Sequence, residues 1–386
     1  MFVKMNDIIK IKKGKKPKIL AKEPNENFMP YVDIKAFEQG IIDNYTNGEK
    51  CLPCENGDLL IVCDGSRSGL VGRAIKGYVG STLARIDIDD SVIPEYIYYF
   101  IQGKYTQLNT NMKGTGTPHV NQELLKSFEL YVPTISEQHR IVTRIEELFS
   151  QLDSGVDTLK KTREQLKIYR QAVLKEAFSM AGNNYILLAN LIEKPRYGTS
   201  KKCEYEENCI AVFRIPNIDY KSGILKKEDL KFAQFSKDEL SNIDLKENDI
   251  LIIRSNGSVS LVGRSAIVRK DDVNSTFAGY LIRVRFIEAS ETKAKYFHYY
   301  LESHQARTYI ENTAKSTSGV NNINSNEIKN INIPICDESK MKEIVTEIES
   351  RLSVCDSIER TIDTALQEAE ALRQSILKQA FEGGLL

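Results

Sequence analysis

A heptad pattern that occurs twice constrains this chain more than any other feature of its sequence. Residues 135–178 contain no proline and a single glycine, Gly155. An apolar residue recurs there every seven positions, at Ile145, Leu152, Leu159, Leu166 and Val173. A stripe sustained for about four repeats is typical of a helix that packs lengthwise against another helix. The stretch therefore predicts one long helix that needs an equally long partner.

The same pattern returns 203 positions later in the chain. The seam positions are then Ile348, Cys355, Ile362, Ala369 and Ile376, and the ending Leu-Lys-Glu-Ala-Phe of residues 174–178 matches Leu-Lys-Gln-Ala-Phe of 377–381. Too many aligned positions are identical for heptad bias alone, so we infer an internal duplication. Each helix would be roughly 65 Å long at 1.5 Å per residue. Because a lone domain of this size has no flank that long, we expect the helices to pair with each other rather than each covering its own domain.

A second repeat precedes each long helix. The apolar runs 59–62 and 250–253 each follow an acidic turn and lead through a polar, glycine-bearing loop. Short β-rich runs punctuated by glycine predict strands joined by tight turns. The distance between the copies grows from 191 to 203 residues along the chain, which places the length differences in loops. The sequence thus predicts an α+β fold in which domains alternate with long helices, with boundaries at 1–134, 135–182, 183–336 and 337–386.

Composition and charge limit the class of function. The 53 Lys and Arg residues balance 53 Asp and Glu residues, so any binding of nucleic acid must use local patches. No apolar run approaches the ~18 residues of a membrane helix and no signal segment follows Met1, which predicts a soluble, cytoplasmic protein without a membrane partner. Seven scattered cysteines argue against a disulfide framework. Cys51 and Cys54 have the spacing of a metal knuckle, but without a second pair we favour buried thiols over zinc.

Catalytic motifs are missing from the sequence. It contains no Gly-x-x-x-x-Gly-Lys phosphate loop, no Gly-x-Gly-x-x-Gly after a strand, and no Asn- or Asp-Pro-Pro-aromatic run of the kind found in DNA amino-methyltransferases. No nucleophile motif stands out, and the four histidines share no metal-ligand spacing. We therefore predict a binding protein rather than an enzyme, with no cofactor of its own.

One kind of loop that recurs in both halves is a candidate for binding DNA. It follows the apolar run and reads Asp-Gly-Ser-Arg-Ser-Gly at 64–69 and Arg-Ser-Asn-Gly-Ser-Val at 254–259. Glycine lets the backbone approach a ligand, Arg and Asn can bond base edges, and Ser can reach phosphates. The alternative is an ordinary hairpin turn that needs glycine for positive φ. Because the loop recurs with these residue types, we favour DNA contact through Ser66, Arg67, Arg254, Asn256 and Ser258.

The other recurring loop spans 113–121 in one half and 315–324 in the other. It gathers Lys, Thr, Ser and Asn, which suit phosphate contact and base readout, although a solvated linker has the same composition. The candidate residues are Lys113, Thr115, Thr117, His119, Asn121, Lys315, Ser316, Asn321 and Asn322. A basic run near the N-terminus is either a track for the DNA backbone or a solvated face, and it contains Lys10, Lys12, Lys13, Lys15, Lys16 and Lys18.

These features together resemble a known family. The run Pro-Thr-Ile-Ser-Glu-Gln-His-Arg-Ile-Val at 133–142 is similar to the Pro-x-x-x-Glu-Gln-x-x-Ile-Val start of the helical regions in specificity subunits of type I restriction–modification enzymes. The endings at 174–178 and 377–385 resemble the end of that family's helices. Arg-Tyr-Gly-Thr-Ser at 196–200 resembles a stretch that opens its second recognition domain. The resemblance covers essentially the whole chain, except that residues 336–341 lack the Glu-Gln of the first copy.

The resemblance implies two target-recognition domains, each reading one half of a split, asymmetric double-stranded DNA site. It implies that the helices form an antiparallel pair that spaces these domains about a pseudo-twofold axis. It also implies a complex with two methyltransferase subunits, which restriction subunits join for DNA cleavage. S-adenosylmethionine and ATP would be cofactors of those partner subunits and not of this chain. Two alternative functions remain for this chain. A stand-alone DNA-binding regulator would bind its operator without a methyltransferase. A coiled-coil protein scaffold would bind no DNA even in the assembled complex.

Overall fold

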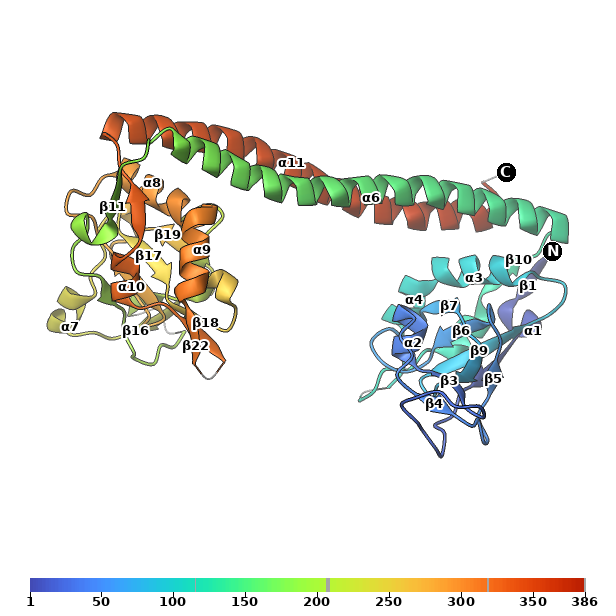
Figure 1. Ribbon diagram of the computed structural model, residues 1–386. Coiled ribbons are helices and arrows are strands. Elements are labelled where there is room, and N and C mark those ends of the chain that lie inside the picture. The colour runs from blue at the N-terminus through green and yellow to red at the C-terminus, as the bar shows by residue number, and fades with distance from the viewer. Residues whose placement is uncertain (115, 206–208, 318, 385–386) are drawn as a thin grey trace. The chain divides into compact units, whose positions relative to one another are not determined.

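The computed structural model describes residues 1–114, 116–205, 209–317 and 319–384. The chain divides into two compact units (Figure 1). Unit 1 comprises Met1–Lys160 with Asp363–Leu386, and unit 2 comprises Lys161–Ile362. Both boundaries fall inside long helices, α6 (Ile135–Ser179) and α11 (Glu338–Phe381). Each unit therefore contains one half of each long helix.

Unit 1 is built from ten short strands and five short helices. Its strands are β1 (Phe2–Lys4), β2 (Ile9–Lys13), β3 (Met29–Val32), β4 (Tyr45–Thr46), β5 (Pro53–Cys54), β6 (Leu59–Val62), β7 (Val71–Arg73), β8 (Gly77–Val79), β9 (Leu83–Ile88) and β10 (Glu129–Tyr131). Its short helices are α1 (Met5–Ile8), α2 (Ile34–Gln39), α3 (Pro94–Gly103), α4 (Tyr105–Thr110) and α5 (Gln122–Ser127).

Unit 2 repeats the main elements of unit 1 and adds further short strands and 3-10 helices. Its strands are β11 (Tyr185–Leu187), β12 (Arg196–Tyr197), β13 (Ile210–Phe213), β14 (Ile218–Asp219), β15 (Ile224–Leu225), β16 (Lys231–Ala233), β17 (Ile250–Ile253), β18 (Ser255–Asn256), β19 (Ser265–Ile267), β20 (Thr276–Phe277), β21 (Leu281–Val284), β22 (Lys315–Thr317), β23 (Val320–Asn322) and β24 (Asn332–Pro334). Its helices are η1 (Leu188–Asn190), η2 (Ile215–Asn217), α7 (Lys237–Asn242), η3 (Val259–Leu261), η4 (Lys270–Asp272), α8 (Glu291–Glu302), α9 (His304–Thr313) and α10 (Ser325–Lys329).

The sheet topology is repeated between the units. A four-stranded antiparallel sheet has the order β2-β9-β6-β7 in unit 1 and β12-β21-β17-β19 in unit 2. A parallel pair recurs as β3 with β8 and as β13 with β20. A two-stranded ribbon recurs as β1 with β10 and as β11 with β24. The predicted duplication is thus confirmed at the level of strand pairing.

The central strand of each four-stranded sheet is buried on both faces. In β6, Leu59 and Ile61 enter one apolar cluster, while Leu60 and Val62 enter another. In β17 the alternate side chains likewise divide between two clusters. Because successive side chains of a strand point to opposite faces, a strand between two cores needs a continuous apolar run rather than an alternating one. This explains the sequences Leu-Leu-Ile-Val and Ile-Leu-Ile-Ile.

The long helices pair antiparallel within each unit. In unit 2, Arg351 of α11 lies 2.7 Å from Glu176 of α6, and Arg170 of α6 lies 3.1 Å from Glu359 of α11, so residue numbers rise in opposite directions. In unit 1, Arg373 of α11 pairs with Asp153 of α6. The seam positions are buried or partly buried on both helices. The predicted α+β fold, a repeated domain with two long helices in antiparallel pairing, is therefore confirmed.

The end of each helix packs on the domain of the other repeat. Phe381, at the end of α11, packs against Tyr96 and Phe100 of unit 1, with ring centroids 5.0 and 5.3 Å apart. Phe178, near the end of α6, packs against Tyr296 and Tyr300 of unit 2 at 5.1 and 5.2 Å. The matching Leu-Lys-x-Ala-Phe endings are thus explained by matching docking sites. Each unit needs both helices to complete its core.

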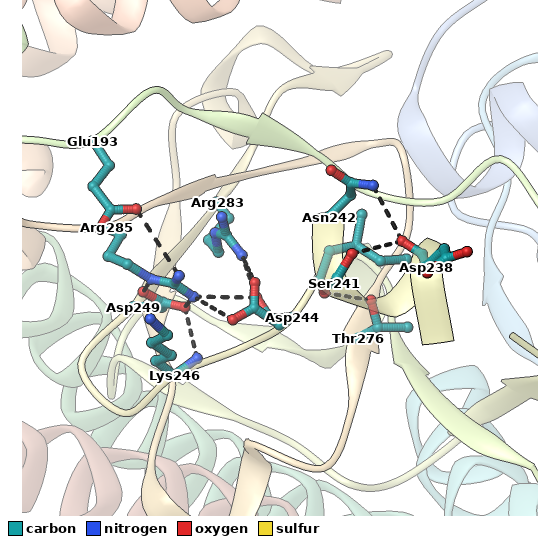
Figure 2. Close-up of polar contacts among 11 residues, drawn as sticks. Glu193, Asp238, Ser241, Asn242, Asp244, Lys246, Asp249, Thr276, Arg283 and Arg285 are labelled. Atoms are coloured by element: carbon teal, nitrogen blue, oxygen red, sulfur yellow. Dashed lines mark hydrogen bonds and ion pairs between the residues drawn. The ribbon is translucent and has the colours of Figure 1, made fainter. Parts of the chain in front are cut away.

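A buried ion-pair network fixes the turn before β17 (Figure 2). The Asp249 carboxylate accepts hydrogen bonds from Nε and Nη2 of Arg285, both at 2.7 Å, and from the backbone N–H of Lys246 at 2.7 Å. Asn248 has a φ of 70° there, and its counterpart Gly57 before β6 has 91°. Such positive φ is easiest for Gly and is tolerated by Asn. The acidic turn of the repeat therefore has a structural role: it fixes the backbone conformation immediately before the central strand.

We expect Asp249→Ala to destabilise unit 2 by about 3–5 kcal/mol, because removing one partner leaves the Arg285 guanidinium buried without its main carboxylate. The matched control is Glu164→Ala, which breaks an ion pair with Lys167 whose side chains are 67% and 66% exposed and costs about 0.5 kcal/mol or less. The chain has no tryptophan, so urea unfolding is followed by circular dichroism. Equal effects of the two substitutions would contradict the structural role of Asp249.

Candidate nucleic-acid interface

The two sequence-predicted loops of unit 1 meet in space. Asp64 and His119 form an antiparallel backbone bridge, and His119 forms another with Lys113. The backbone N–H of Gly65 donates to the carbonyl of Pro118 at 2.8 Å, and His119 Nδ1 lies 2.7 Å from Asp64 Oδ1. The loop after β6 and the loop before α5 therefore form one polar surface, which we call loop surface 1.

Lys13, at the end of β2, also belongs to loop surface 1. Its Nζ lies 2.9 Å from Asp64 Oδ2. Partial burial opposes ionisation of Asp64, but hydrogen bonds from Lys13 and His119 outweigh it and hold the pKa of this carboxyl below its ordinary value. Asp64 thus stays ionised and fixes two potential DNA contacts, one cation and one imidazole. Part of the N-terminal basic run is therefore placed beside the predicted loops.

The other predicted residues of unit 1 differ in what their side chains do. Arg67 is 59% exposed and pairs with Glu38 of α2, while exposed Lys113 pairs with Glu123. Asn121 caps α5, because its Oδ1 accepts from the backbone N–H of Leu124 at 3.1 Å. Ser66 and Thr117 are exposed, and Thr115 lies outside the described residues.

In unit 2 the equivalent loops form a small sheet with the strand order β18-β23-β22. Ser255 and Asn256 pair with Asn322 and Asn321 across it, and Lys315 and Ser316 belong to its β22 strand. Asn321 Nδ2 donates to the carbonyl of Gly257 at 3.0 Å. Asn256 Oδ1 accepts from the backbone N–H of Ser258 at 2.8 Å. We call these residues loop surface 2.

Arg254, at the base of loop surface 2, is held by three neighbours. Its guanidinium lies 4.6 Å from the centroid of the Tyr197 ring, its Nε donates to Asn322 Oδ1 at 3.2 Å, and its Nη1 donates to the carbonyl of Gly279 at 3.4 Å. The Tyr197 hydroxyl in turn accepts from the backbone N–H of Ser325 at 3.0 Å. The side chain of Arg254 is therefore held in one orientation.

Tyr197 and Lys13 occupy equivalent places in the two units. Lys13 pairs with Ala84 of β9, and Tyr197 pairs with Ile282 of β21. The glycine after each lies so close to a neighbouring strand that a Cβ would stand 2.3 Å from a carbonyl oxygen at Gly14 and 2.2 Å at Gly198. This third repeat was not predicted from the sequence. Its only sequence signal is a Gly after the strand, since Lys-Lys-Gly-Lys-Lys and Arg-Tyr-Gly-Thr-Ser share no other residue.

Among the other histidines and cysteines, His298 and Cys54 belong to the buried scaffold. His298 is buried, its Nδ1 lies 3.0 Å from the Ser265 hydroxyl, and burial followed by the charge of Arg264 lowers its pKa to about 4. The seven cysteines are free thiols, and burial raises the pKa of Cys54 to about 11. Within the described ranges, no group of three His, Cys, Asp or Glu side chains is placed to hold a metal ion. No helix of those ranges has the length and apolarity to cross a membrane.

The fold and the loop surfaces define a two-unit repeat, and comparison with known proteins identifies its family. The model of the type I restriction modification DNA specificity domain matches residues 1–167 and again residues 188–368. These matches cover most of the chain, so the chain belongs to this family.

Individual relatives agree with the family match. The specificity subunit of the StySPI type I restriction enzyme of Salmonella potsdam is 26% identical over 349 residues, which cover 85% of this chain and 74% of the relative. The EcoKI specificity subunit of Escherichia coli K12 is 24% identical over 351 residues, which cover 85% and 75%. A solved chain of a type I restriction–modification system covers 100% of this chain and 98% of its own length, with a TM-score of 0.77 and 18% identity, which shows a shared fold.

Proposed function

We propose that this chain is the DNA sequence-recognition subunit of a type I restriction–modification complex, in which each unit reads one half of a bipartite, asymmetric site. Residues 1–134 and 183–336 act as the two target-recognition domains. One observation carries the proposal: loop surfaces 1 and 2 lie at equivalent places of a repeated topology but present different side chains. Equivalent surfaces suit two similar tasks on DNA, and different side chains suit different base sequences.

The candidate DNA contacts divide by chemistry. Exposed cations such as Arg67 and Lys113 suit phosphates, and amide and imidazole side chains such as Asn256, Asn321 and His119 suit base edges. Asn121 has its side-chain oxygen engaged in the cap of α5, which leaves its amide nitrogen and one lone pair of that oxygen for a ligand. Glu38 holds Arg67 and acts as its positioning partner in this account.

The helical regions 135–182 and 337–386 act as a spacer and as the docking site for two methyltransferase subunits. The paired helices leave large apolar side chains in solvent, with Ile168 73%, Val354 57% and Leu372 51% exposed. Apolar side chains on the outer faces of a two-helix pair suit packing against further helices. The two helix beginnings differ, since only the first has Glu-Gln, at 137–138. Gln138 is buried and bonds the backbone of Ile93 and Ser91, so its role in unit 1 is structural.

Catalysis belongs to the partners in this proposal. The methyltransferase subunits bring S-adenosylmethionine, the restriction subunits bring ATP-dependent cleavage, and the complex works in the cytoplasm. The chain itself contributes sequence recognition and spacing and is not an enzyme. Its role is to decide where on the DNA the partner subunits act.

We expect the purified chain to bind DNA weakly by itself and to gain at least tenfold in affinity with a co-expressed methyltransferase subunit. Its formal net charge is zero, so the long-range electrostatic attraction that dominates affinity for DNA is small. Titrations of a labelled duplex at one fixed salt concentration, with and without the partner, measure the gain.

The same titrations separate the proposal from its alternatives. Tight, sequence-specific binding by the chain alone would favour a stand-alone regulator. No specific binding by the assembled complex would favour a protein scaffold. A duplex of scrambled sequence is the control for non-specific binding.

A further inference from the structure

Unit 2 contains a hollow of about 670 Å³ beside loop surface 2, which we call the basic hollow. It lies between residues 197–201 with Cys203, at and after β12, and residues 278–280, before β21. Its other walls are residues 214–216, Lys231 and Arg254. Two tyrosines, Tyr197 and Tyr280, line it together with small residues. Its volume falls within the range of small-molecule sites and admits one sugar-phosphate group.

The charged residues that line the basic hollow are all cations, although Lys201 pairs with Glu239 and Arg214 with Asp229 outside the lining. Four cations line it, and no Asp or Glu does so among the residues that the structure describes. This bias stands out because acids and bases balance in the whole chain. Four other hollows of the described residues each include at least one glutamate. The cations of the basic hollow are Lys201, Arg214, Lys231 and Arg254.

Arg254 differs from the other buried or half-buried arginines of residues 183–336. Arg214 pairs with Asp229, and a carboxylate also lies beside each of Arg264, Arg283, Arg285 and Arg307. Arg254 has no carboxylate within ion-pair distance in the described part of the chain; its partners are an amide oxygen, a carbonyl oxygen and the Tyr197 ring. A half-buried cation of this kind lacks a counter-charge, which an anionic ligand would supply.

The geometry of Arg254 leaves donors for such a ligand. Its Nε and one N–H of Nη1 are engaged by Asn322 and Gly279, so the two N–H groups of Nη2 and one of Nη1 remain. Guanidinium N–H groups of this kind are suited to donate to the oxygens of a phosphate. The hydroxyls of Thr199 and Ser200 also line the hollow and can donate to phosphate oxygens.

We propose that the basic hollow is a binding site for a backbone phosphate of the DNA in the second half-site, with Arg254 as its main ligand and Tyr197 as the residue that positions Arg254. The inference rests on the proposed function, because it takes DNA as the ligand of unit 2. It assigns Arg254 to the phosphate backbone rather than to a base edge. Unit 1 has Cys63 at the place of Arg254. The backbone carbonyl of Cys63 accepts a hydrogen bond from the N–H of Val120 at 2.8 Å, and the carbonyl of Arg254 accepts the equivalent bond from the N–H of Ile323 at 2.8 Å. The site therefore belongs to unit 2 alone.

The test uses the complex of the full chain with its methyltransferase subunit. Its affinity for DNA is measured at several salt concentrations. With Arg254→Gln we expect about tenfold weaker binding and a slope of log affinity against log salt that is smaller by about 0.9, the value for one lost phosphate contact. The methylated sequence should not change. Arg254→Lys keeps the charge and should keep the slope. Tyr197→Phe keeps the ring and should bind within about twofold of the native complex, whereas Tyr197→Leu should resemble Arg254→Gln.

The control is Lys226→Gln, which removes one cation of unit 2 next to β15, a strand that contacts β19 at the sheet edge opposite β12. Its slope should match that of the native complex. An unchanged slope for Arg254→Gln would overturn the proposal, as would relaxed specificity at one base pair, which would make Arg254 a base reader. Millimolar nucleoside triphosphate that bound the native complex but not Arg254→Gln, without displacing any DNA, would also overturn it, because the hollow would then be a nucleotide site that DNA does not use. A native complex that methylates no bipartite site would refute the proposed function instead.

Discussion

Inserting one heptad into each long helix, at points level with each other, is expected to lengthen the non-specific spacer of the recognised site by about three base pairs or to abolish activity. The contact between Asp153 of α6 and Arg373 of α11 marks such a level, so the insertions go after Asp153 and before Arg373. Seven residues add about 10 Å to a helix at 1.5 Å per residue. DNA rises about 3.4 Å per base pair.

The seam explains why a whole heptad is required. The buried positions Ile145, Ile348, Ile362 and Ile376 recur with the heptad, and an insertion of seven residues keeps them in register. Three added base pairs also turn the groove by over a quarter of a roughly 10-pair helical turn, which is why lost activity is the other expected result. Full activity on the original spacer would contradict the role of the helices as a ruler.

A matched variant carries two extra residues in α6 alone. Two residues rotate the apolar stripe by about 200°, so the seam beyond the insertion faces solvent. We expect this variant to lose activity and to unfold at lower urea concentration than the heptad variant. Genome-wide methylation mapping and urea unfolding compare the two. Equal stability of both variants would show that the seam does not hold the helices together.

Exchanging residues 1–134 for the same domain of another family member is expected to change one half of the methylated sequence completely and to leave the other half unchanged. Loop surface 1 lies within the exchanged segment. Loop surface 2 and its clusters belong to unit 2, so nothing that reads the second half-site is altered. A change in both halves would contradict the division of labour between the units.

The exchanged domain must preserve two sets of contacts with the long helices. Ile376 and Leu377 of α11 belong to the core of unit 1, and Phe381 packs on Tyr96 and Phe100. The donor domain therefore needs aromatic residues at these two places. Thr134 bonds Glu137 at the start of α6, so the donor also needs Thr or Ser there. The control is the chain with its own residues 1–134 reinserted by the same cloning steps as the donor domain.

The long helices and the strand repeat could be predicted from the sequence because their signals are local and occur twice. A heptad stripe and an apolar run depend only on residues near each other in the chain. Because each pattern occurs twice at a matching offset, it is unlike a pattern that arises by chance. The helices begin and end within a few residues of the expected positions. Tyr169, three residues after the seam position Leu166, is 44% exposed, and its hydroxyl and ring both contact Arg351.

The site was harder to predict because its contacts join residues far apart in the sequence. Arg254 meets Tyr197 across 57 positions, and Arg67 meets Glu38 across 29. No local pattern encodes such a contact. The composition of a loop also cannot separate a DNA contact from a helix cap, as Asn121 shows. Nothing in the basic run distinguished Lys13, which is fixed by Asp64, from its neighbours.

The most direct test of the account is methylation mapping of the genome of cells that express the native chain with its methyltransferase subunits. The account predicts one methylated sequence made of two different specified segments, separated by a non-specific spacer of constant length. Two differing loop surfaces on a repeated fold require such an asymmetric, split site. A methylated sequence that is continuous, or that has identical halves, would contradict the central claim that each unit reads its own half-site.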